Sequence, residues 1–90
     1  MPLRKIVELP NFKQDLEMFR QNYPEMDDIY EAAIEDLLDN PFDGKQSNTL
    51  SDLRSYLTHP VGDAPTFWIY YSYDLEHIYM HQIRKVDFLA

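Results

Sequence analysis

The sequence predicts an α+β domain in the order β-α-α-β-β-β, with a helical hairpin packed on one face of a small antiparallel sheet. Two apolar stripes with helical spacing lie in the first half of the chain. Aromatic and β-branched runs with an alternating pattern dominate the second half. The 90 residues are enough for one modest hydrophobic core but not for two. We therefore expect a single domain that spans residues 1–90.

The N-terminal segment is expected to form a short strand followed by a helix. Residues 3–9 suit a strand, which Pro10 stops. Asn11 is then a suitable N-cap, and Gln14 completes a capping-box pattern. Four apolar residues repeat at helical spacing after it: Phe12, Leu16, Phe19 and Tyr23. The helix is expected to end at residues 22–24, because Pro24 cannot continue it.

The second helix has the strongest periodic pattern in the chain, over residues 25–39. Its broad apolar stripe comprises Met26, Ile29, Tyr30, Ala33, Ile34, Leu37 and Leu38. Glu25, Asp27 and Asp28 favour its N-terminus through the helix dipole, and Asn40 with Pro41 stops it. The two helices should therefore form a hairpin that turns at Pro24.

The second half of the chain is expected to supply three strands. A polar loop at residues 42–51 precedes a strand at 53–57, and strands at 66–74 and 77–85 follow. Alternation places one set of side chains on one face of the 66–74 strand: Phe67, Ile69, Tyr71 and Tyr73. The opposite face receives Trp68, Tyr70 and Ser72. A three-stranded antiparallel sheet with both helices on one face is the simplest way to bury both apolar stripes.

The formal net charge of −8 is unevenly distributed along the chain. Eleven acidic residues lie between Glu8 and Asp43, where the only cations are Lys13 and Arg20. This charge disfavours attraction of the whole protein to nucleic acid. It suits a protein partner with a basic segment. The alternative is that the acidic face only keeps the protein soluble. The absence of cysteine excludes disulfides, thiolate catalysis and cysteine-based zinc sites. No apolar run suggests a membrane span or a signal peptide, so we expect a cytoplasmic protein without a membrane partner.

Three histidines are the candidate acid–base groups, since a histidine pKa lies near neutrality. On one strand, His77 and His81 would lie about 13 Å apart, which is too far to share a metal ion. We therefore predict no metal site. No glycine-rich phosphate loop is present, and no cofactor is expected. The candidate catalytic residues are His59 and His81 as acid or base, and Arg84 and Lys85 as phosphate ligands.

Trp68 and Tyr70 are the candidate contact residues. If the helices cover the face that carries Phe67, these two rings lie on the open face of the sheet. There they can stack on a nucleobase or anchor a protein partner, and packing under a neighbouring loop is the alternative. Arg54, in the preceding strand, is a further candidate contact for RNA or a partner.

The element order and several segments resemble the RelE/ParE superfamily of bacterial toxins, and the RelE/YoeB type in particular. The resemblance rests on residues 40–45 (Asn-Pro-Phe-Asp-Gly-Lys), on Leu50, and on the strand patterns at 69–71 and 78–84. It covers essentially the whole chain. It implies a RelE-like fold and a cognate antitoxin as partner.

Ribosome-dependent nucleases of this superfamily surround the scissile phosphate with a basic pair, a strand-opening arginine and a C-terminal polar group. A glutamate that YoeB-like members add falls near Asn48 in this chain, and the basic pair falls near Leu57 and His59. Trp68 stands at the position of the strand-opening arginine. The C-terminal group falls on Arg84, Lys85, Val86 and Asp87. The resemblance thus implies an mRNA interferase with a depleted catalytic constellation.

Two alternative functions remain open. A ParE-like inhibitor of DNA gyrase, or a degenerate member that only binds protein, does not need the nuclease residues that Trp68 and Val86 replace. An acidic adaptor unrelated to toxins would account for the cluster of acids between Glu25 and Asp43.

Overall fold

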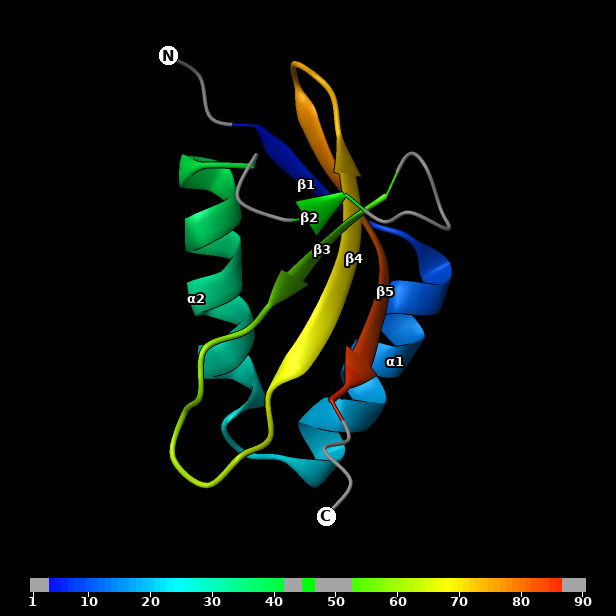
Figure 1. Ribbon diagram of the computed structural model, residues 1–90. Coiled ribbons are helices and arrows are strands. Elements are labelled where there is room, and N and C mark those ends of the chain that lie inside the picture. The colour runs from blue at the N-terminus through cyan, green and yellow to red at the C-terminus, as the bar shows by residue number, and fades with distance from the viewer. Residues whose placement is uncertain (1–3, 42–44, 47–52, 87–90) are drawn as a thin grey trace.

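The computed structural model describes residues 4–41, 45–46 and 53–86. Strand β1 (Lys5–Glu8) leads into helices α1 (Pro10–Asn22) and α2 (Met26–Asp39). Strands β2 (Lys45–Gln46), β3 (Arg54–Leu57), β4 (Phe67–Tyr73) and β5 (His77–Lys85) follow (Figure 1). The expected order of elements is confirmed, with the two-residue β2 added inside the segment that was expected to be a loop. The rest of that segment, including Asn48, lies outside the described residues, as does Asp87.

The sheet is mixed and has the strand order β1-β5-β4-β3-β2. The pairs β2–β3, β3–β4 and β4–β5 are antiparallel, whereas β1 runs parallel to β5. The expectation of a purely antiparallel, three-stranded sheet is therefore wrong. A parallel pair needs a long crossover between its strands, and here both helices and the three other strands lie between β1 and β5.

Helix α1 begins at Pro10, so the predicted capping box at Asn11 and Gln14 is wrong. The N-cap position is Leu9, whose side chain makes no capping hydrogen bond. Proline at the first helical position explains the earlier start, since its fixed φ suits a helix and its missing N–H would have no intrahelical partner there. The expected ends are confirmed, because α1 stops at Asn22 and α2 at Asp39.

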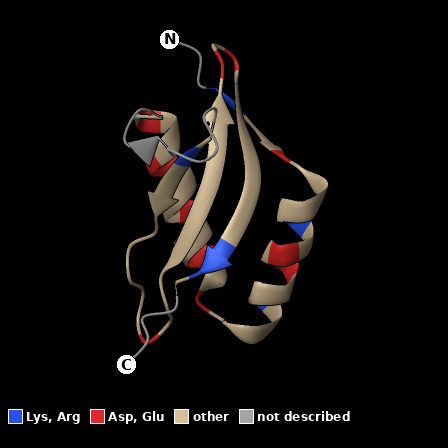
Figure 2. Cartoon of the chain, turned by 45° about the vertical axis from the view of Figure 1, so that its right-hand side comes forward, with Lys and Arg blue, Asp and Glu red and all other residues tan. Residues whose placement is uncertain are grey.

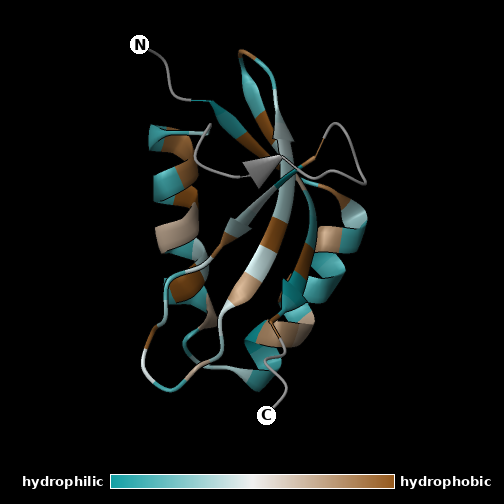
Figure 3. Ribbon diagram, in the orientation of Figure 1, coloured by the Kyte–Doolittle hydropathy of each residue, from teal (hydrophilic) through white to brown (hydrophobic). Residues whose placement is uncertain are grey.

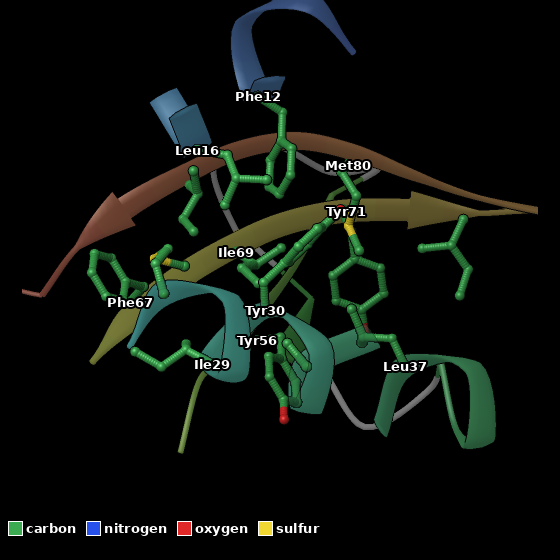
Figure 4. Packing of buried hydrophobic residues seen from close by; sticks show 14 residues of the cluster. Phe12, Leu16, Ile29, Tyr30, Leu37, Tyr56, Phe67, Ile69, Tyr71 and Met80 are labelled. Carbon is green, nitrogen blue, oxygen red and sulfur yellow. The ribbon is translucent and has the colours of Figure 1, made fainter. Parts of the chain in front are cut away.

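Both helices pack on the same face of the sheet and form one core with it (Figure 4). The helices contribute Phe12, Leu16, Met26, Ile29, Tyr30, Ala33 and Leu37. The sheet contributes Tyr56, Phe67, Ile69, Tyr71, Ile78, Met80 and Ile83. The hydrophobic sides of the helices turn toward the sheet, and their hydrophilic sides turn outward (Figure 3).

No helix of the described part of the chain covers the face of the sheet opposite α1 and α2. In β4, Phe67, Ile69 and Tyr71 are 0% exposed, which confirms the predicted alternation. Residues paired in register share a face, so the remaining positions can be assigned across the sheet. We call the face opposite the helices the open face; it comprises Lys5, Val7, Ser55, Leu57, Trp68, Tyr70, Ser72, His77, Tyr79, His81, Gln82 and Arg84.

Candidate functional site on the open face of the sheet

Four of the predicted site residues share the open face. Trp68 and Tyr70 lie there on β4, next to Arg84 and Gln82 of β5 in the strand register. His81 lies between them and the β4–β5 turn. Arg84 follows His81 by three positions, which is about 10 Å along a strand. A long arginine side chain can therefore reach a ligand that also contacts the His81 ring.

The other three predicted residues lie elsewhere. His59 follows β3, and its Nε2 atom lies 3.1 Å from the carboxylate of Asp36 in α2, on the helix-covered side. Lys85 pairs with the buried Phe67 and is therefore directed toward the helix-covered side at the end of β5. Arg54 lies over the ring of Tyr73, 5.5 Å from its centroid, also on that side. The structure thus does not bring the two candidate histidines together in one site.

A β-bulge in β5 determines where His81 lies on the open face. Tyr71 pairs with Met80 and Tyr70 pairs with Gln82, so that His81 is the extra residue of β5. Its Nε2 atom lies 2.8 Å from the hydroxyl oxygen of Ser72, also on the open face. Partial burial lowers the pKa of His81 below its ordinary value of 6.5. The ring is therefore neutral at pH 7 and available as a proton acceptor.

None of the residues that define the open face is acidic, in a protein whose net charge is −8. The Asp74 carboxylate borders this face at the β4–β5 turn, where it accepts the Tyr79 hydroxyl at 3.0 Å. The charged side chains of the open face are the cations of Lys5 and Arg84. Acidic residues lie instead on the helices and at the tip of the β4–β5 hairpin (Figure 2). Glu8 of β1 points away from the open face and accepts a hydrogen bond from the Tyr30 hydroxyl. The charge distribution therefore separates an acidic helical side from a weakly cationic sheet side.

These groups can perform a limited set of chemical tasks. A neutral histidine can remove a proton, an arginine can hold a phosphate, and the half-buried rings of Trp68 and Tyr70 can stack on bases. Over the described residues, no group of three or more potential ligands is placed to hold a metal ion. The site therefore fits recognition and proton transfer on an anionic substrate with planar bases.

Sequence reasoning missed Ser72 and Gln82 as members of the site. Alternation along β4 places Ser72 on the open face, but its contact with His81 depends on the β4–β5 register. Gln82 would lie on the helix side in a regular strand, and only the bulge keeps it beside Tyr70. A bulge has no reliable signature in a single sequence.

The fold and the open face together define a small α+β protein in which, over the described residues, the helices cover one face of the sheet. No protein-family model matches the chain, and no curated protein matches it either. Within the described ranges, no helix has the length and apolar character needed to cross a membrane.

Proposed function

We propose that the protein is the toxin-like component of a toxin–antitoxin system with a RelE-like fold, and that it cleaves mRNA on the ribosome through its open face. The observation that carries the proposal is that Trp68, Tyr70, His81 and Arg84 share the open face. The cytoplasm, where ribosomes and mRNA meet, is the compartment that this activity requires.

The net negative charge does not prevent RNA from approaching this face. The acidic residues of α2 lie on the helix-covered side of the sheet. All of them are exposed to solvent except Asp36, which accepts a hydrogen bond from the Tyr56 hydroxyl of β3. At physiological ionic strength the Debye length is about 8 Å, so their repulsion is strongly screened at the open face. Arg84 pairs with Trp68 in the strand register and supplies a positive charge beside the two rings. Trp68 and Tyr70 add base stacking, which contributes about 1–3 kcal/mol per base. Stacking depends less on the salt concentration than the attraction between a cation and a phosphate does.

The proposed reaction uses the RNA's own 2′-hydroxyl as the nucleophile. His81 removes the 2′-hydroxyl proton, and the oxygen attacks the adjacent phosphorus. The bond from phosphorus to the 5′-oxygen of the next nucleotide breaks, and that oxygen takes a proton from water. The products are a 2′,3′-cyclic phosphate and a 5′-hydroxyl end. Arg84 stabilises the negative charge that develops on the phosphate oxygens, and Ser72 holds the His81 ring by its Nε2 atom.

The test is an in vitro translation assay with purified ribosomes and a defined mRNA, with cleavage sites mapped by primer extension. We expect cleavage by the wild-type protein and a loss of about 100-fold in His81→Ala, since a general base contributes about that much or more. Arg84→Ala should lose about 10-fold or more, whereas Lys13→Ala, on the outer side of α1, should retain activity. His59→Ala should also retain activity, because His59 is bonded to Asp36 on the other side of the sheet.

Intact mRNA with the wild-type protein would refute the nuclease proposal. Loss of activity in His59→Ala but not in His81→Ala would refute the site assignment. A DNA supercoiling assay then separates the alternatives, because gyrase inhibition without mRNA cleavage would indicate a ParE-like member. The expected partner in either toxin function is an antitoxin, and a basic antitoxin segment suits the acidic helical side.

A further inference from the structure

The turn between β4 and β5 carries a small hollow beside an exposed apolar side chain. The hairpin projects beyond the neighbouring elements at one end of the molecule (Figure 1). Leu75 at its tip is 90% exposed. The hollow has a volume of about 300 Å³ and is lined by Asp74, Leu75, Glu76, His77 and Tyr79. A leucine this exposed, next to a concave surface, is a suitable contact for another molecule.

The turn is held in one conformation by its own hydrogen bonds. The Oδ1 atom of Asp74 accepts the backbone N–H groups of Glu76 at 2.8 Å and His77 at 2.7 Å. Its Oδ2 atom accepts the Tyr79 hydroxyl at 3.0 Å. The segment before β1 braces the same turn, since Arg4 Nε donates to the Asp74 carbonyl at 2.6 Å. A surface that is already ordered loses little conformational entropy when it binds a partner.

Two rings and one carboxylate give the hollow its chemical character. The rings of His77 and Tyr79 are stacked, with centroids 5.6 Å apart and planes at 30°. Both oxygens of Asp74 are already engaged as acceptors. The exposed carboxylate of Glu76 makes no hydrogen bond or ion pair within residues 4–41, 45–46 and 53–86. The hollow therefore offers an apolar contact, an aromatic face and a carboxylate that is open to a new partner.

We propose that this hollow binds an arginine side chain of a protein partner. The methylene groups of the arginine pack against Leu75, while its guanidinium lies on the His77–Tyr79 ring pair and bonds to Glu76. A guanidinium fits better than the ammonium of lysine, because it is planar and stacks on rings. The two carboxylates of the tip repel phosphate, so the site is distinct in chemistry from the RNA surface proposed for Trp68 and Arg84. It does not depend on that proposal.

The test is a titration of the ¹⁵N-labelled full chain with the peptide acetyl-Ala-Arg-Ala-Arg-Ala-amide, followed by two-dimensional amide NMR. We expect the largest shift changes in residues 74–79. The variants Glu76→Gln and Leu75→Ala should each raise Kd by about threefold or more, as expected for one exposed ion pair or one apolar contact. The same peptide with lysine in place of arginine should bind more weakly.

The matched control is Glu35→Gln, which makes the same charge change at an exposed position of α2. It should leave Kd unchanged. Equal weakening by Glu35→Gln and Glu76→Gln, or shift changes spread along α2, would overturn the proposal in favour of general attraction to an acidic protein. Shift changes at the tip with a single-stranded RNA oligonucleotide, but not with the arginine peptide, would also overturn it. Both substituted side chains at the tip are exposed, so the variants keep the fold, and the spectra themselves report it.

Discussion

Replacing Tyr71 by phenylalanine tests the assignment of the two faces of β4, on which the candidate site depends. Tyr71 is 0% exposed, and its hydroxyl donates a hydrogen bond of 2.6 Å to the backbone carbonyl of Pro41. The substitution removes the donor and leaves that buried carbonyl without this bond. Such a loss costs about 1–3 kcal/mol of unfolding free energy. For a domain of this size it should lower Tm by about 4–8 °C for each kcal/mol.

The measurement is urea unfolding followed by circular dichroism, with thermal unfolding in parallel. The control is Tyr70→Phe, the same chemical change one residue earlier on the open face, which should alter stability by less than about 0.5 kcal/mol. A Tyr71→Phe variant as stable as the wild type would refute the reasoning. So would equal destabilisation by the two variants, because the alternation of β4 would then not separate a buried face from an open one.

Two further predictions concern pH and backbone conformation. Burial lowers the pKa of His81 in the folded protein. As the pH falls below about 6.5, His81 therefore becomes protonated in the unfolded chain before it does so in the folded protein, which destabilises the folded state. The wild type should therefore lose more stability between pH 7.5 and 5.5 than His81→Gln, as measured by urea midpoints; equal losses would contradict the burial of the ring. Gly62 has φ of +56°, and an added Cβ would lie 3.5 Å from Glu25 Oε2, an ordinary contact. Gly62→Ala should thus lower the free energy of unfolding by about 1 kcal/mol through backbone strain alone. The control Asp63→Ala should lower it by less. An unchanged urea midpoint for Gly62→Ala would contradict this prediction.

Local patterns predicted the elements well where one periodicity extended over several turns or residues. The apolar stripe of α2 and the alternation of β4 are examples, because each repeats a burial pattern that only one secondary structure satisfies. The start of α1 was predicted two residues late, since Pro10 acts both as a strand terminator and as a first helical residue. The parallel pairing of β1 with β5 could not be predicted, because it joins segments about 70 residues apart and has no local pattern.

The sequence predicted only those residues of the candidate site whose position follows from the alternation of side chains along a strand. Trp68 and Tyr70 follow directly from the period of β4. The relation of His81 to Ser72 depends on a bulge, which changes the register after Met80 without any glycine to mark it. The sequence alone could not show that His59 and His81 lie on different sides of the sheet. The position of His59 depends on its contact with Asp36, which lies on a helix 23 residues earlier.

The central position of β5 determines when this chain can fold during synthesis. This strand comes last among the described strands, yet it lies between β1 and β4 and supplies Ile78, Met80 and Ile83 to the core. A nascent chain that has not yet released β5 from the ribosome has no neighbour for β1 and lacks the strand between β1 and β4 on which α1 packs. The sheet can therefore form only after β5 has left the ribosome, so a truncated chain that lacks β5 would remain unfolded.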